Sequence, residues 1–165
     1  LAVPYTGMII STRESPAVRE KVIRLGISQI SGASRTSVGG YVEPEPEKDS
    51  TNQFYVSDQR TLDEVVNWLM RDGFIPSFCT EGYRKGRTGD RFMSICKKGE
   101  IQNCCHPNAL MTLKEYLEDY ASPETKELGN ALITRELDNI STAGIREITL
   151  RNLKSIEQGQ RDFRF

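Results

Sequence analysis

The pattern of apolar and polar positions divides this 165-residue chain into an alternating first half and a helical second half. Short apolar runs at residues 5–11, 27–31 and 74–78 predict three buried strands. Periodic apolar positions between these runs predict two helices. Because a strand, a helix and a second strand follow one another, we expect parallel pairing in an α/β fold.

Helix-start and helix-stop signals support this division. Ser15 is predicted as an N-cap before Pro16, and Gly26 ends that helix, whose apolar stripe is Val18, Val22, Ile23 and Leu25. Thr61 and Glu64 form a capping box for the next helix, with its apolar face at Leu62, Val65, Val66 and Leu69 and its stop at Asp72 and Gly73.

Beyond Pro107 the periodicity is helical throughout. Thr112 and Glu115 predict a second capping box, and a Ser-Pro pair at 122–123 predicts another helix start. A last helix is expected at 143–158, followed by a tail whose two aromatic residues dock on the body. The acidic, proline-bearing segment 42–60 has few apolar residues, and we expect it to form a long surface loop.

The predicted sheet is incomplete by itself. Three parallel strands with helices on one side leave two edges and one face uncovered, whereas parallel sheets are normally covered on both faces. The chain also begins at Leu1, directly before a strand. We therefore expect a fragment, namely the last part of a larger α/β barrel followed by a helical appendix. Self-association of this fragment through its exposed apolar surface is expected as well.

Composition narrows the function classes. The 22 basic and 23 acidic residues nearly cancel, which argues against nucleic acid or a membrane surface as the partner. No apolar run approaches the roughly 20 residues of a membrane span, and the start lacks the pattern of a signal peptide.

The four cysteines and the only histidine lie close together in the sequence. Thiols clustered in this way make a poor disulfide framework and favour metal ligands or reactive thiols in a cytoplasmic protein. The five candidate ligands are Cys79, Cys96, Cys104, Cys105 and His106.

Ten segments together point to one family. They are YTGMIISTRE at 5–14, ISQI at 27–30, SR at 34–35, VGGY at 38–41, DGFIPSFCT at 72–80, YR at 83–84, GRTG at 86–89, PNAL at 107–110, LKEYL at 113–117 and DYASPETK at 119–126. These segments resemble the HydG family, the tyrosine-cleaving radical-SAM maturases of [FeFe]-hydrogenase, with more distant relatives in the thiamine-pathway tyrosine lyase and biotin synthase. The resemblance implies the last three βα units of a (β/α)8 barrel in residues 1–80, then a cysteine loop and helical region of the biotin- and thiamin-synthesis-associated type in residues 81–165.

The resemblance also implies a chemistry that the chain cannot start alone. In the family, a CxxxCxxC motif in the amino-terminal part of the barrel binds a [4Fe-4S] cluster and S-adenosylmethionine, and L-tyrosine is cleaved into p-cresol and dehydroglycine. That motif is absent from these residues. The implied partners are the missing barrel portion and other hydrogenase maturation proteins. The alternative is a non-catalytic metal-binding or assembly module derived from the family.

A second cluster site in the family has the form CxxCx22C. Its first and third cysteines fall on Cys79 and Cys105, but its second position is Gly82, which has no side chain to bind iron. An altered [4Fe-4S] site would need its third ligand from Cys96, Cys104 or His106. Zinc held by Cys79, Cys96, Cys105 and His106 is a second possibility, and loss of the site is the third.

The end of the second predicted strand is the expected substrate-binding position. Ser34 and Arg35 lie where α/β barrels bind their ligands, and a guanidinium suits a substrate carboxylate. No catalytic residue is assigned.

Overall fold

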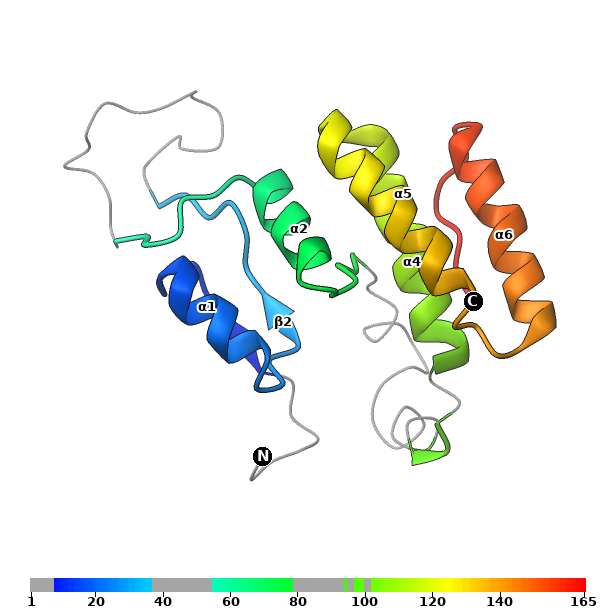
Figure 1. Ribbon diagram of the computed structural model, residues 1–165, viewed down its shortest axis with the longest axis horizontal. Coiled ribbons are helices and arrows are strands. Elements are labelled where there is room, and N and C mark those ends of the chain that lie inside the picture. Colours follow the sequence, from blue (N-terminus) through cyan, green and yellow to red (C-terminus); the bar gives the residue numbers. More distant parts are fainter. Residues whose placement is uncertain (1–7, 37–54, 79–93, 95–96, 100–101) are drawn as a thin grey trace. The chain divides into compact units, whose positions relative to one another are not determined.

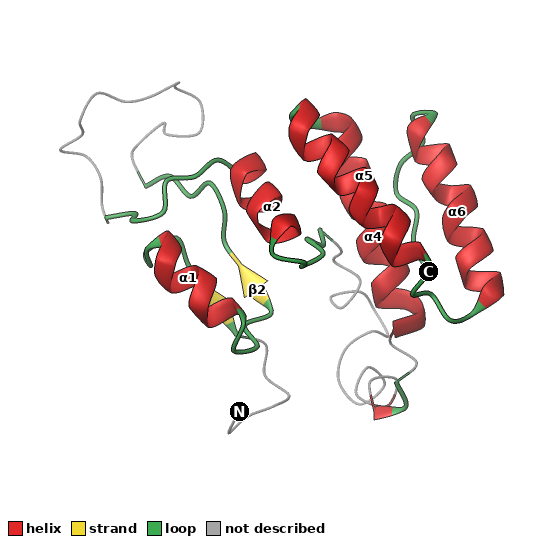
Figure 2. Ribbon diagram, in the orientation of Figure 1, coloured by secondary structure: helices red, strands yellow, loops and turns green. Residues whose placement is uncertain are grey.

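The computed structural model describes residues 8–36, 55–78, 94, 97–99 and 102–165. The chain divides into two compact units, Leu1–Val65 and Val66–Phe165, which are described in turn. Helices are the main elements, with a small sheet in the first unit (Figures 1 and 2).

The first unit contains a parallel β-α-β arrangement. Strand β1 (Ile9–Ile10) is followed by α1 (Pro16–Ile23) and strand β2 (Gln29–Ile30). The two strands pair in parallel with Ile9 opposite Gln29 and Ile10 opposite Ile30. The α/β class and the first two predicted strands are therefore confirmed, although each strand has only two residues.

Helix α1 begins as predicted but buries an unexpected face. The Ser15 hydroxyl accepts a hydrogen bond from the amide of Val18 at 3.4 Å, and Pro16 is the first helical residue. The buried residues of the helix are Arg19 and Ile23, whereas Val18 is 40% exposed and Leu25 is 73% exposed. The apolar stripe proposed for this helix is thus partly wrong, because a charged side chain occupies its inner face.

The capping box of α2 (Leu62–Arg71) is confirmed. The amide of Thr61 donates to the Glu64 carboxylate at 2.7 Å, and the amide of Glu64 donates to the Thr61 hydroxyl at 3.2 Å. These hydrogen bonds lower the pKa of Glu64. At the other end, Gly73 has a φ of +84°, and the amide of Phe74 donates to the carbonyl of Leu69 at 2.9 Å. This is a Schellman ending, which a glycine at that position favours.

The third strand predicted at 74–78 is wrong, since these described residues adopt no strand. The amide of Phe78 donates instead to the Thr112 hydroxyl at 3.2 Å, and the Phe78 ring stacks on Tyr116 with centroids 5.0 Å apart. Contacts with a helix therefore replace the expected pairing in the sheet.

The second unit is a helical assembly around α4 (Gln102–Asp119). Helix α4 packs against both α5 (Pro123–Leu137) and α6 (Ala143–Glu157). Buried residues of all three helices form one core with the last residues of α2. Its members include Val66, Met70, Leu110, Leu113, Leu117, Leu132, Ile133, Leu153 and Ile156.

The second capping box, predicted at Thr112 and Glu115, is wrong because α4 begins at Gln102 and runs through both residues. The Thr112 hydroxyl donates to the carbonyl of Ala109 at 3.2 Å, within the helix. The signal misleads because a helix interior can carry the same Thr-x-x-Glu spacing as a helix start.

The remaining helix boundaries and the tail agree with the sequence. The Ser122 hydroxyl accepts a hydrogen bond from the amide of Thr125 at 3.3 Å, and Pro123 is the first residue of α5. Phe163 and Phe165 pack against the helical core, and the amide of Phe165 donates to the Asn108 side chain at 2.9 Å. The docked tail is therefore confirmed.

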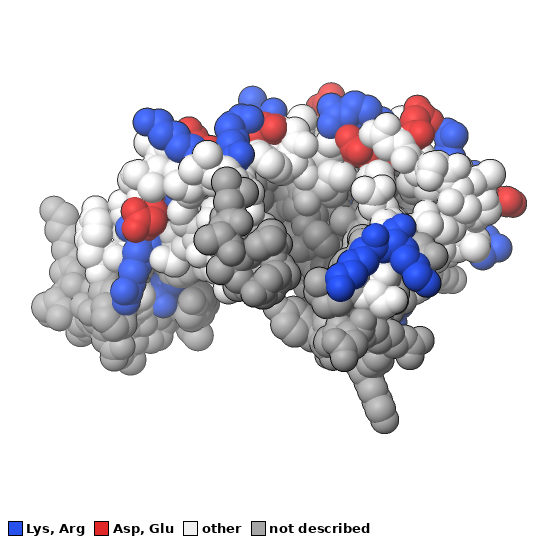
Figure 3. Space-filling view, turned by 90° about the horizontal axis from the view of Figure 1, so that it is seen from below, with Lys and Arg blue, Asp and Glu red and all other residues white. Residues whose placement is uncertain are grey.

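The described surface carries charges of both signs. Basic and acidic side chains are intermixed on the described residues of the face in Figure 3, which agrees with the balanced composition. Among the described helices, none combines the length and apolar character needed to cross a membrane.

Helices α4 and α5 approach closely at Gly129. A Cβ atom at this position would overlap with the side chain of Leu117, which is itself fully buried. Gly144 on α6 provides the contrast, because nothing lies within 4 Å of a Cβ placed there. Glycine at 129 is thus required by packing, and glycine at 144 is not.

We predict opposite effects of alanine at these two helical glycines. Gly129→Ala should lower the free energy of unfolding by about 1–3 kcal/mol, because a well-packed core cannot absorb the added methyl group without strain. Gly144→Ala should raise it by up to about 1 kcal/mol, because alanine is the better helix former. Chemical denaturation measures both. Equal stability of the two variants would contradict the close approach of α4 and α5.

Candidate functional site

A polar network joins the loops that follow β1 and β2. The guanidinium of Arg19 forms an ion pair with Asp58 and donates to the carbonyl of Ser31, directly after β2. The amide of Asp58 donates to the carbonyl of Thr12, after β1, at 2.9 Å. Residues from α1, from both strand ends and from the segment before α2 are thereby tied together.

The centre of this network is buried. The side chains of Arg19 and Asp58 are each 0% exposed, and Arg60 adds hydrogen bonds of 2.9 and 2.6 Å to the same carboxylate. Burial alone raises the pKa of Asp58, but the hydrogen bonds from Arg60 and Arg19 outweigh it and hold the pKa below its usual value. Asp58 therefore remains ionised and keeps both guanidinium groups in place.

The sequence analysis missed this network. Asp58 falls in the segment 42–60, expected to be a surface loop, yet it is only 1% exposed. The interpretation is therefore wrong for this residue, while residues 42–54 lie outside the described part of the chain. One available signal was the position of Arg19, which lies four residues before Ile23 and so shares its inward face.

The predicted carboxylate-binding pair lies just beyond the network. Ser34 is half-buried and Arg35 is exposed, and both follow the Ser31 carbonyl that Arg19 holds. The structure thus places them on a supported loop after β2. Their role in binding a substrate stays a prediction.

The carboxy-terminal members of the cysteine cluster lie on the first turns of α4. Cys104 is half-buried, Cys105 is exposed and His106 is half-buried. Successive helical residues differ in direction by about 100°, so the two neighbouring thiols do not face the same point. The Nε2 atom of His106 lies 3.5 Å from a carboxylate oxygen of Glu136 on α5.

The other two predicted ligands, Cys79 and Cys96, lie outside the described residues, as does Gly82. Among the residues that are described, no three side chains able to hold a metal come together. The donor set nevertheless suits iron or zinc chemically, since thiolates bind both, and Cys105 presents its side chain at the surface.

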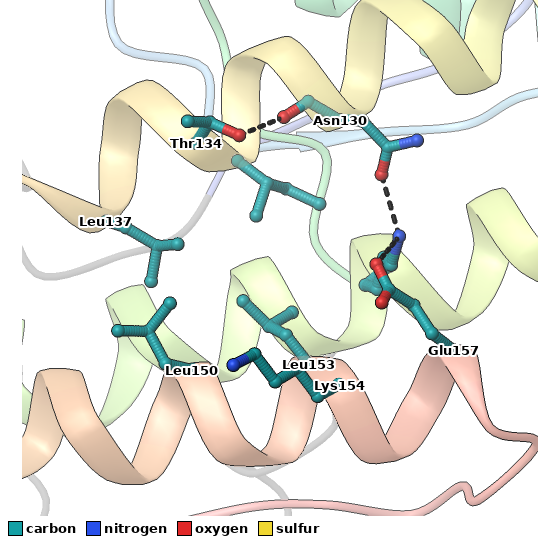
Figure 4. A pocket seen from close by; sticks show the side chains of 9 residues that line it. Asn130, Thr134, Leu137, Leu150, Leu153, Lys154 and Glu157 are labelled. Atoms are coloured by element: carbon teal, nitrogen blue, oxygen red, sulfur yellow. Dashed lines mark hydrogen bonds and ion pairs between the residues drawn. The ribbon is translucent and has the colours of Figure 1, made fainter.

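A cavity of about 270 Å³ lies between α5 and α6 over α4 (Figure 4). Ile133, Leu137, Leu150 and Leu153 line its apolar part. At its polar end the ammonium of Lys114 contacts Asn130, Glu118 and Glu157 at 2.8, 2.9 and 2.8 Å.

The volume falls below the roughly 300–1,000 Å³ of ligand pockets. Since three acceptors already occupy the Lys114 ammonium, we assign the cavity a structural role.

A known structure matches both units. The crystal structure of HydG, a maturase of the [FeFe]-hydrogenase, is 51% identical to this chain, with a TM-score of 0.90 over 99% of the chain. The chain resembles the carboxy-terminal portion of HydG. It covers 35% of that solved chain, so the HydG-like residues correspond to about a third of a longer protein.

A family model matches the first part of the HydG-like chain. The family model for the Biotin and Thiamin Synthesis associated domain matches residues 1–75. The resemblance implies that type in residues 81–165, whereas the family model matches residues 1–75. The division at residue 80 stays a prediction.

The curated relatives are 2-iminoacetate synthases. Those of Escherichia coli (strain K12) and Salmonella typhimurium (strain LT2) are 35% identical over 91 residues and 38% identical over 76 residues. These alignments span 55% and 46% of the HydG-like chain but only 23% and 19% of the relatives. The chain thus matches about a fifth of each curated enzyme.

Removing the Asp58 charge should destabilise the first unit. Asp58→Asn is expected to cost about 3–5 kcal/mol at pH 7, because it leaves the buried Arg19 without its counter-charge. Hydrogen exchange of the Gln29 and Ser31 amides, which bond across the strand pair, measures the local effect. Asp138→Asn is the control, since its ion pair with Arg146 is exposed and is worth about 1 kcal/mol or less.

Asp58 also predicts how the folding stability depends on pH. Because folding lowers the pKa of Asp58, its stabilisation is complete above the unfolded value of about 3.9 and is lost as the pH falls through the folded value. Thermal unfolding between neutral and acidic pH should therefore show a steeper acid loss in the parent chain than in Asp58→Asn. Parallel curves would contradict an ionised, buried Asp58.

Proposed function

We propose that this chain serves as the carboxy-terminal portion of a HydG-like radical-SAM tyrosine lyase that acts in maturation of the [FeFe]-hydrogenase cofactor. The observation that carries the proposal is 51% identity to HydG over 99% of the chain. The similarity to 2-iminoacetate synthases supports the same chemistry, because 2-iminoacetate is dehydroglycine, the second product expected from tyrosine cleavage.

In this proposal residues 1–80 complete a (β/α)8 barrel whose other strands come from the missing amino-terminal portion. When bound in that portion, a [4Fe-4S] cluster with S-adenosylmethionine would supply the radical chemistry for cleavage of L-tyrosine. The residues of this chain bind and position: Arg35 pairs with the substrate carboxylate, and Ser34 adds a hydroxyl. The Arg19–Asp58 ion pair keeps the loop that bears both residues against the strand ends.

The second metal site is proposed to be altered rather than complete. Cys79 and Cys105 correspond to the first and third cysteines of the CxxCx22C pattern, and Gly82 stands at its second position. Cys96, Cys104 or His106 would have to replace the missing thiolate around an iron–sulfur cluster. Tyrosine cleavage would then continue without full conversion of dehydroglycine at this site.

Exchange of the matching region tests the lyase assignment. A chimera in which this chain replaces the corresponding part of HydG should convert L-tyrosine into p-cresol after anaerobic reconstitution. Arg35→Gln should raise the KM for tyrosine about tenfold or more, because a charged hydrogen bond to the carboxylate is lost. Arg24→Gln, at the exposed end of α1, is the matched control.

The outcomes separate the two functions under consideration. Formation of p-cresol with a KM effect confined to Arg35→Gln supports the lyase portion. A folded chimera that forms no p-cresol would instead favour the non-catalytic metal-binding or assembly module.

Restoring the absent thiol tests the altered site. Gly82→Cys should increase the iron bound after anaerobic reconstitution towards four atoms per chain, because it completes the family pattern of thiolate ligands. Gly86→Cys, which adds a thiol outside that pattern, should not. Iron analysis and EPR spectroscopy measure the result. A complete four-iron cluster in the unaltered chain would overturn the proposed alteration.

A further inference from the structure

The first turn of α4, residues 102–106, carries two thiols and lacks one hydrogen bond to its own helix. We call these residues the cysteine turn. Pro107 follows them inside α4 and has no amide hydrogen, so the carbonyl of Asn103 lacks the helical hydrogen bond it would otherwise accept. Something other than the helical ladder must therefore help to hold this turn in place.

One contact comes from the start of α6. Thr142 occupies the N-cap position of α6, yet its side chain makes no capping hydrogen bond. Its hydroxyl donates instead to the Asn103 side chain at 3.2 Å. A capping threonine is typically worth about 1 kcal/mol to its own helix, so this contact takes the place of a cap.

The second contact comes from the end of α5. Nε2 of His106 is shielded from solvent and lies 3.5 Å from the Glu136 carboxylate, without a hydrogen bond to any described residue. That carboxylate is itself fixed, since the Asn139 amide donates to it at 2.9 Å. The hydrogen bond from Asn139 is the main reason that the pKa of Glu136 lies below its usual value, which keeps the carboxylate ionised opposite His106.

Both contacts join the cysteine turn to one corner of the fold, residues 136–142. Asn103 and His106 lie on either side of the two cysteines in sequence. A metal bound at Nε2 would lie about 2 Å from it, in the shielded space beside Glu136, whereas Cys105 is exposed. On the helix, the exposed Cys105 also leaves the backbone in a direction about 100° from that of His106.

We propose that Asn103 and His106 are positioning residues that dock the cysteine turn onto the α5–α6 corner, and that His106 is not a metal ligand. This excludes the zinc set that includes His106 and leaves the thiolates to hold any metal. The part that concerns the metal rests on the proposed function, and the docking itself does not.

A double-mutant cycle in the full chain tests the docking. His106→Leu should lower the Tm by about 2–4 °C, and Glu136→Leu by at least as much, because it also removes the hydrogen bond from Asn139. The double variant should show no larger shift than Glu136→Leu, because that change already breaks the contact with His106. His106→Gln keeps an N–H donor and should recover at least half of the loss. Glu127→Leu, at an exposed position of α5, is the control and should leave the Tm unchanged.

Additive shifts, or no shift in either single variant, would overturn the docking. Thr142→Val gives an independent measurement on the other contact. It should lower the Tm even though it removes no cap, and an unchanged Tm would show that the contact with Asn103 does not hold the turn.

Iron content separates positioning from ligation. After anaerobic iron–sulfide reconstitution, His106→Gln should bind as much iron as the parent chain, while His106→Leu and Glu136→Leu should lose iron to the same extent. Loss in both His106 variants with full retention in Glu136→Leu would identify His106 as a ligand and overturn the proposal. If the parent chain binds no iron, the proposed metal site fails, and the Tm cycle still decides the docking.

Discussion

A buried charge controls the first unit. Arg19 cannot lose its proton at physiological pH, so once α1 places it against the strand ends, an acid must be there to meet it. Asp58 fulfils this requirement from a position 39 residues away in sequence. The backbone amide of Asp58 also donates to the loop after β1, and the guanidinium of Arg19 donates to the loop after β2. Two strands of two residues each would otherwise provide little support for these loops.

The second unit depends on apolar packing instead. Helix α4 contacts α5 and α6, and the core residues it contributes are almost completely buried. Because Gly129 has no side chain, α5 can approach Leu117 closely. Side-chain packing therefore determines the spacing of α4 and α5 more than hydrogen bonds do. The cysteine turn lies at one end of this rigid assembly, where its contacts to the α5–α6 corner give it a defined position.

Local signals in the sequence predicted most of the helices. Ser15, the capping pair of α2 and Ser122 bond to nearby amides, so a few consecutive residues contain the whole signal. Thr112 shows the limit of this reasoning, because the same motif occurs inside a long helix. The third strand failed for a related reason, since Phe78 donates its amide and stacks its ring on α4, a contact that periodicity does not reveal.

The candidate site was less predictable, because it depends on contacts between distant residues. Nothing near Asp58 in sequence indicates burial, and only its pairing with Arg19 explains it. The clustering of cysteines was visible at once, but their directions on α4 and the contact of His106 with Glu136 required coordinates. Cys79 and Cys96 stay predictions from the sequence, since they lie outside the described residues.

Lys114 restricts how helices α4, α5 and α6 align with one another. Its ammonium takes one acceptor from each helix, Glu118 on α4, Asn130 on α5 and Glu157 on α6. Sliding α5 or α6 by one turn would replace an acceptor with a different residue and leave part of a buried charge unsatisfied. Apolar side chains alone tolerate many such shifted arrangements. The contacts of Lys114 therefore favour a single relative register of the three helices among those that apolar core packing alone would allow.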